Sequence, residues 1–187
     1  LTYDPLGRIK TVTDAGGGVT VRHYLGLDVV EEVRATGNRS YAVAFGIDQA
    51  LAMADGAQVH HLHRDHIWSV VAVSSAAGAI AERYDYDLFG NLTKSVNGSG
   101  APLAGAPLCS LYQGRPALLQ GLLDVRQRVL HAGLGRFLQC DPAGMQADAN
   151  PYRFALNDPT MFVDPSGEIV FIPILVGAAV GTGISAW

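Results

Sequence analysis

The chain has 187 residues, of which 49% are hydrophobic and 16% are charged, and its formal net charge is −4. This length suits a single domain with a real core, and the apolar content excludes an intrinsically disordered chain. A mildly acidic chain lacks the basic stripe that nucleic-acid-binding proteins usually carry, so we expect no nucleic-acid partner. Because charged residues make up roughly 25% of an average chain, we expect part of this surface to face protein.

Turn-forming residues are frequent, with 22 glycines and 9 prolines that follow no collagen period. Residues 3–16 contain Tyr-Asp-Pro-Leu-Gly followed by a short β-branched run and Asp-Ala-Gly, and residues 86–98 repeat this order. Asp hydrogen-bonds its own backbone two residues on, Gly adopts positive φ freely, and Tyr suits a half-buried pleated surface. Each segment therefore predicts a strand, a tight turn closed by glycine, and a second strand.

Further turn signals fall at residues 35–38, 54–56 and 76–78, and alternating runs at 40–45 and 69–74 predict strands between them. No segment before residue 100 has a helical period over 12 residues. These features predict a mainly β fold built as an antiparallel meander.

No cofactor motif is present, and we expect neither a cofactor nor a metal. Four histidines lie at positions 60, 61, 63 and 66, where His61 and His63 would share one face of a strand. A zinc site needs further tightly held ligands, and no cysteine lies nearby. The two cysteines, Cys109 and Cys140, could form a disulfide, but nothing in the local sequence requires it. Two buried or unpaired thiols without a functional role are the favoured interpretation.

The Tyr-Asp…Gly segments resemble the YD repeats of bacterial Rhs and wall-associated proteins, which also occur in insecticidal toxin-complex C subunits and teneurins. Further stretches resemble the Rhs-repeat-associated core that closes such an array, in the family's order and with its paired Asp-Pro-x-Gly elements. These stretches are residues 63–69, 81–90, 134–144, 150–159 and 162–167. Because the chain starts without Met in the middle of a Tyr-Asp pattern, we interpret it as a piece of a longer protein.

The resemblance implies a spiral β shell with a core that curls inward as a plug. It divides the chain into a YD-repeat shell segment over 1–100, the core over 101–168, and an apolar tail over 169–187 that starts the variable C-terminal region. It implies as partners the rest of the shell, a C-terminal effector and secretion machinery. The implied location is secreted, or on the surface of a bacterium.

In many members of the family the core is an aspartic protease that cuts its own chain just after the second Asp-Pro-x-Gly. Motif matching places the two carboxylates at Asp141 and Asp164 and the accompanying arginine at Arg128. Two carboxylates that share a site hold one proton, so one acts as base on water and the other as acid. Without the resemblance, both aspartates are ordinary turn or capping residues, and this alternative stays open.

The implied cleavage region is Gly167, Glu168 and Ile169, and here the sequence departs from the family, which commonly has Leu after the motif. The Glu168 carboxylate would add like charge beside the pair. Two functions therefore stay open. One is a toxin shell that encapsulates an effector and releases it by self-cleavage, and the other is a non-cleaving structural or adhesive surface protein.

Residues 169–187 contain no charged side chain and are just long enough to span a bilayer as a helix. Pro173 and three glycines in this stretch are tolerated in membrane helices. Two interpretations remain: membrane contact during delivery, or a segment held inside the shell or leading to the effector.

Overall fold

The computed structural model describes residues 1–44, 46–101, 110–118, 121–144 and 148–170. Ten strands form one antiparallel sheet in which each strand pairs with the next along the chain. They are β1 (Thr2–Tyr3), β2 (Ile9–Thr13), β3 (Val19–Leu25), β4 (Asp28–Arg34), β5 (Gly37–Val43), β6 (Ala50–Asp55), β7 (Gln58–Arg64), β8 (Val70–Ser75), β9 (Ile80–Tyr86) and β10 (Leu92–Asn97). The predicted antiparallel β fold is confirmed.

A repeated corner joins many of these strands. Its first residue, an Asp or Asn, accepts hydrogen bonds through Oδ1 from the backbone N–H groups two and four residues later, at 2.8–3.1 Å. The residue three positions later has positive φ, which favours glycine. The corners start at Asp4, Asp14, Asp65, Asp87 and Asn97. The turn chemistry expected of the Tyr-Asp segments is thus present.

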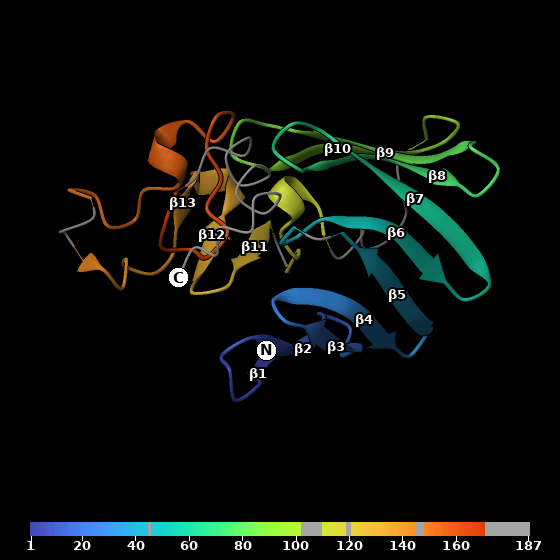
Figure 1. Ribbon diagram of the computed structural model, residues 1–187, viewed down its shortest axis with the longest axis horizontal. Helices are drawn as coiled ribbons and strands as arrows, with labels where there is room; N and C mark the ends of the chain where they lie inside the picture. Colours follow the sequence, from blue (N-terminus) through green and yellow to red (C-terminus); the bar gives the residue numbers. More distant parts are fainter. Residues whose placement is uncertain (45, 102–109, 119–120, 145–147, 171–187) are drawn as a thin grey trace.

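A smaller sheet and short 3₁₀ helices follow the meander, and the elements named here are those whose residues the structure describes in full. The sheet contains β11 (Leu122–Val125), β12 (Arg128–His131) and β13 (Arg136–Phe137), and the helices are η1 (Tyr112–Gly114), η2 (Ala132–Leu134) and η4 (Ala155–Asn157). Figure 1 shows that the large sheet is strongly curved and that the small sheet lies at its open side. The described residues between 110 and 170 therefore pack beside the concave side of the meander.

Two buried apolar clusters hold these parts together. One lies on the large sheet and includes Val70, Val73 and Tyr84, joined by Leu111. The other centres on Leu130 and Phe137 of the small sheet. The second cluster also includes Ile67, from a corner of the large sheet. Burial of apolar area across both sheets therefore fixes the second sheet against the first.

The boundaries at residues 100 and 168 stay predictions. Most of the predicted apolar tail, residues 171–187, lies outside the described residues. Of the helices in the described part of the chain, none has the length and apolar character needed to cross a bilayer.

Candidate active site

The three residues matched to the family's catalytic set meet around one guanidinium. Arg128 begins β12, and its Nη1 lies 2.9 Å from Oδ2 of Asp141, while its Nη2 lies 3.4 Å from Oδ2 of Asp164. The side chains are 3%, 8% and 1% exposed, respectively. The guanidinium also lies over the ring of Phe137, 3.8 Å from its centroid. The sequence thus predicted a set of residues that the fold does bring together.

Both aspartates also have the alternative role that the sequence left open, as turn residues. Asp141 Oδ1 accepts a hydrogen bond from the N–H of Ala143 at 2.9 Å. Asp164 Oδ1 accepts from the N–H groups of Gly167, Glu168 and Ile169 at 2.8, 3.1 and 3.2 Å. Each carboxylate therefore closes its turn with one oxygen and faces Arg128 with the other. The turn role and the ion-pair role coexist.

The peptide bond that follows the second Asp-Pro-x-Gly lies inside this arrangement. The carbonyl oxygen of Gly167 accepts a hydrogen bond from Nε of Arg128, and the nitrogen of Glu168 donates to Asp164. Gly167 has a φ of +79°, and a Cβ there would lie 2.2 Å from the carbonyl oxygen of Val125. Only glycine lets the loop approach β11 this closely, so the residue type sets the position of the carbonyl.

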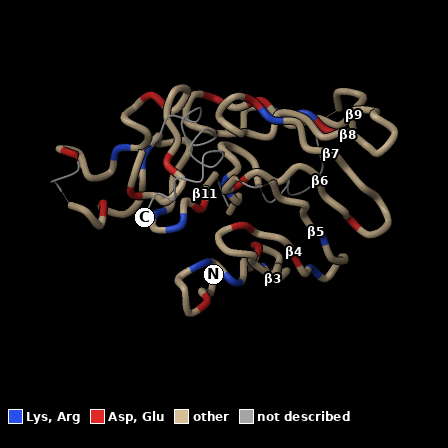
Figure 2. Tube along the Cα trace, in the orientation of Figure 1, with Lys and Arg blue, Asp and Glu red and all other residues tan. Residues whose placement is uncertain are grey.

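The buried surroundings of Asp164 change the pKa of its carboxyl group from the value it has in water. Burial raises the pKa of the Asp164 carboxyl above its ordinary value, although the N–H of Gly167 and the charge of Arg128 act in the opposite direction. A carboxyl with a raised pKa keeps its proton more readily and can donate it. Figure 2 shows basic and acidic positions close together around β11, where this cluster lies.

A cavity of about 170 Å³ opens beside the cluster. Its lining residues are Arg128, Asp141, Asp148, Asn150, Arg153, Leu156, Glu168 and Val170. The space exceeds that of a water molecule, and its wall is polar, which are the conditions for a bound water. The site therefore joins two carboxylates, a guanidinium, a peptide bond and room for water.

A second buried ionic cluster was not predicted from the sequence. The carboxylate of Asp48 lies 2.7 Å from Nη2 of Arg115 and 2.7 Å from Nη2 of Arg126. Both arginines also donate through Nη1 to the carbonyl oxygen of Pro165, the residue after Asp164. These three residues are far apart in the chain and belong to no motif, so only the folded chain reveals them.

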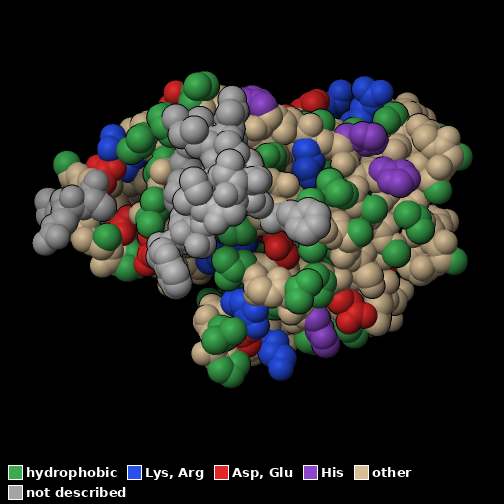
Figure 3. All heavy atoms as spheres, in the orientation of Figure 1, with side chains coloured by type: hydrophobic (Ala, Val, Ile, Leu, Met, Phe, Trp, Pro, Cys, Tyr) green, Lys and Arg blue, Asp and Glu red, His purple; other side chains and the backbone are tan. Residues whose placement is uncertain are grey.

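His61 and His63 of β7 are exposed and His60 is partly buried, and Figure 3 shows two histidine side chains next to each other on the face drawn, with others apart from them. His63 Nε2 lies 2.8 Å from the Ser74 hydroxyl, and His66 Nε2 lies 2.9 Å from the Thr160 carbonyl oxygen. Within the described residues, no group of three His, Cys, Asp or Glu side chains is arranged to hold a metal ion. Cys140 is free and exposed, and Cys109 lies outside the described residues.

No family model matches the chain. It is 30% identical over 193 residues to the double-stranded DNA deaminase toxin A of Burkholderia cenocepacia, covering 88% of this chain and 13% of that protein. It is 29% identical over 194 residues to the tRNA3(Ser)-specific nuclease WapA of Bacillus spizizenii, covering 97% of this chain and 8% of that protein. The chain thus spans a small part of these relatives.

Among solved structures, the Tc holotoxin pore of Photorhabdus luminescens with a mutation in TccC3 matches with a TM-score of 0.67. That match covers 88% of this chain and 8% of the other, at 20% sequence identity, so it concerns the fold alone. The relatives of this chain are proteins associated with Rhs and Tc toxins, and its mainly antiparallel β fold is that of Tc toxin shell proteins.

Proposed function

We propose that this chain is the closing segment of an Rhs-type toxin shell and that it cuts its own backbone between Gly167 and Glu168. One observation carries the proposal. Arg128 contacts both candidate carboxylates and also the carbonyl oxygen of Gly167. A guanidinium in this position favours negative charge on that oxygen, which develops when water adds to the carbonyl carbon.

The chemistry assigns a separate role to each carboxylate. Asp141 faces the cavity and acts as the base that takes a proton from water as its oxygen attacks the Gly167 carbonyl carbon. Arg128 stabilises the oxyanion of the tetrahedral intermediate. The bond between the Gly167 carbon and the Glu168 nitrogen then breaks, and the Asp164 carboxyl group gives its proton to that nitrogen. In the uncut chain this nitrogen donates its own N–H to Oδ1 of Asp164 at 3.1 Å, so the carboxyl group is already next to the leaving nitrogen. The products are a carboxyl group on Gly167 and an amine on Glu168.

Two features support these roles. Burial raises the pKa of Asp164, as an acid that starts protonated requires. The contacts of Glu168 with Asp164 come from its backbone nitrogen, so replacing the family's Leu by Glu does not remove them. A single turnover suffices for a chain that cuts itself, and the proton on Asp141 need not be returned.

The comparisons support a shell role for this segment. The names of the two relatives give different activities, DNA deamination and tRNA cleavage, although both match most of the present chain, 88% and 97% of its residues. A segment that is shared by proteins of different activity does not explain either activity, and this favours a common role as part of the shell. We infer that residues 1–100 are one segment of a larger shell, that the core of 101–168 closes the shell, and that residues 169–187 lead to an enclosed effector. We further infer that its partners are the rest of this shell and the secretion machinery of a bacterium that secretes it or displays it.

The test is the intact mass of the purified full-length protein that carries this chain, followed by N-terminal sequencing of any C-terminal product. Cutting at the proposed bond gives a product that begins with Glu168. Asp164→Asn and Asp141→Asn each slow cutting by about 10²–10⁴-fold, the usual contribution of general acid–base catalysis.

Asp14→Asn is the matched control, because Asp14 also closes a turn through Oδ1 but lies in an exposed corner of the meander. Its cutting rate should equal that of the unsubstituted chain. A single uncut mass for the unsubstituted protein would overturn self-cleavage and leave the non-cleaving surface protein as the function.

A further inference from the structure

The loop that contains the candidate scissile bond is held by two further arginines besides Arg128. Pro165, next to Asp164, has a carbonyl oxygen that accepts hydrogen bonds from two arginines. Nη1 of Arg115 donates to it at 3.0 Å, and Nη1 of Arg126 also donates to it. A carbonyl bound by two guanidinium groups fixes the orientation of the peptide plane between residues 165 and 166. That plane precedes Gly167 by one residue.

One carboxylate from the meander holds both arginines. Asp48, in the turn between β5 and β6, lies 2.7 Å from each of them through its two oxygens. Its side chain is 4% exposed and that of Arg115 is 1% exposed. Burial lowers the pKa of the Arg115 guanidinium, and the charge of Asp48 opposes this. A buried guanidinium needs such a partner, because an unpaired buried charge is costly.

The position of Asp48 is itself fixed by the large sheet. Its backbone N–H donates to the Asp28 carboxylate at 2.6 Å, and its carbonyl oxygen accepts from Nη1 of Arg64 at 3.0 Å. Its φ is 64°, in the left-handed region, which Asp and Asn adopt more readily than other non-glycine residues. A Cβ on Gly114 would lie 2.4 Å from the Asp48 carbonyl oxygen, so the core approaches this turn closely.

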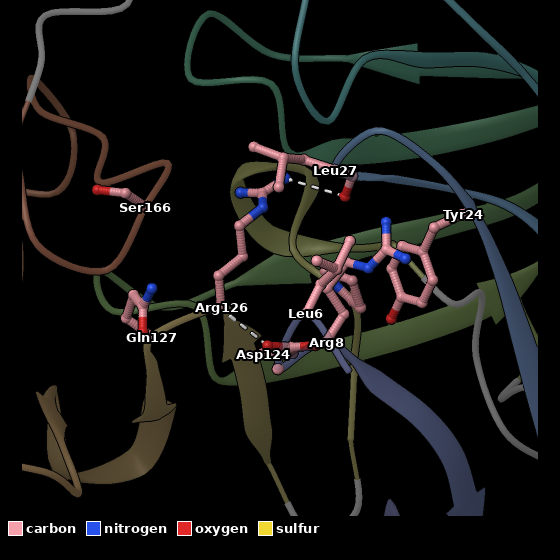
Figure 4. A pocket seen from close by; sticks show the side chains of 10 residues that line it. Leu6, Arg8, Tyr24, Leu27, Asp124, Arg126, Gln127 and Ser166 are labelled. Atoms are coloured by element: carbon pink, nitrogen blue, oxygen red, sulfur yellow. Dashed lines mark hydrogen bonds between the residues drawn. The ribbon is translucent and has the colours of Figure 1, made fainter. Parts of the chain in front are cut away.

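Arg126 joins the same regions at a second point. Figure 4 shows its side chain reaching from the hairpin between β11 and β12 to Leu27, in the turn between β3 and β4. Its Nη2 donates to the Leu27 carbonyl oxygen at 3.3 Å. Two turns of the meander therefore contact the arginine that binds the loop.

We propose that Asp48 is a positioning residue for the self-cleavage reaction, which it serves by holding Arg115 and Arg126 against the carbonyl of Pro165. This inference rests on the proposed self-cleavage. Asp48 touches neither the scissile bond nor the candidate acid and base, and it acts only through the two arginines. Self-cleavage then requires that the turns of the meander and the core hairpin have come together, so an incompletely folded shell does not cut.

The experiment compares Asp48→Asn with Asp55→Asn in the full-length protein. Asn tolerates the positive φ of position 48, so this change removes the charge with little backbone cost. Asp55 is the matched control because it also binds two arginines, Arg34 at 3.0 Å and Arg39 at 2.8 Å, but within the meander. We expect Asp48→Asn to slow cutting at least tenfold and Asp55→Asn to leave the rate unchanged.

A second measurement separates positioning from general stability and does not need cutting. In an Asp141→Asn background, hydrogen exchange is followed at the amides of Gly167, Glu168 and Ile169, all of which donate to Asp164. Asp48→Asn should speed their exchange, whereas amides of β8 should keep theirs. If Asp48→Asn fails to fold, Arg126→Gln, which leaves the pair of Asp48 with Arg115, should give the same local change.

The outcomes are distinct. Equal effects of the two Asn variants on cutting and exchange, or no effect of Asp48→Asn on either, overturn the positioning role. If the unsubstituted protein does not cut, the proposed function fails, and the exchange measurement still decides whether Asp48 holds the loop.

Discussion

The Asp corners of the meander and the two Asp-Pro-x-Gly corners of the core use the same local chemistry with different results. In both, a carboxylate oxygen accepts backbone N–H groups and so closes a turn. In the meander, the corner at Asp14 is exposed to water. In the core, the second oxygens of Asp141 and Asp164 both face the buried Arg128. Burial and a shared counter-charge turn an ordinary turn residue into a candidate acid or base.

The largest change in stability is expected when the shared counter-charge, the guanidinium of Arg128, is removed. Arg128→Met removes the cation that lies between two buried carboxylates, and we expect the free energy of unfolding to fall by about 3–5 kcal/mol. Arg34→Met is the control, because its partner Asp55 is partly exposed and still binds Arg39. That change should cost no more than about 1 kcal/mol. Denaturant unfolding of both variants measures the contrast, and equal losses would contradict it.

A second test compares two glycines at the same place in two corners. Gly90 and Gly7 both have positive φ, +88° and +78°. A Cβ on Gly90 would lie 2.3 Å from the ring of Tyr112, whereas a Cβ on Gly7 would meet nothing within 4 Å. We expect Gly90→Ala to cost about 1–3 kcal/mol more than Gly7→Ala, since only the former displaces a buried ring. Similar melting temperatures for the two variants would show that Tyr112 of the core is not packed closely against Gly90.

The smallest effect is a difference in how stability responds to pH. Burial raises the pKa of Asp164 in the fold above 3.8, so the folded state holds the proton more tightly than the unfolded state. Stability contributed by this proton is lost as pH rises from about 3.8 through the folded pKa. Asn cannot ionise, so Asp164→Asn should gain stability relative to the unsubstituted chain over this range.

Asp55 should behave in the opposite way. Burial acts to raise its pKa, but the hydrogen bonds from Arg39 and Arg34 outweigh this and hold it below 3.8. The ionised form therefore stabilises the fold, and this stability is lost as pH falls through the folded pKa. Asp55→Asn should lose stability relative to the unsubstituted chain as pH rises through this range. Unfolding free energies measured from pH 3 to 7 give both slopes, and slopes of equal sign would contradict the assignment.

The sequence by itself determined the strands and their order. A corner such as that at Asp4 or Asp87 is encoded within five residues, because its hydrogen bonds join a side chain to its own backbone. The two Asp-Pro-x-Gly elements and Arg128 could also be picked out, but only because they match a family pattern. Nothing in their spacing says that two aspartates from separate turns share the guanidinium of Arg128.

Only the tertiary structure decided which charges are buried together. Asp48 lies 67 residues before Arg115 and 78 before Arg126 in the chain, and all three are joined by contacts that no local pattern encodes. The burial that raises the pKa of Asp164, whose side chain is 1% exposed, likewise arises only in the folded chain. Local hydrogen bonds make the corners predictable, whereas long-range burial decides which of them can carry out chemistry.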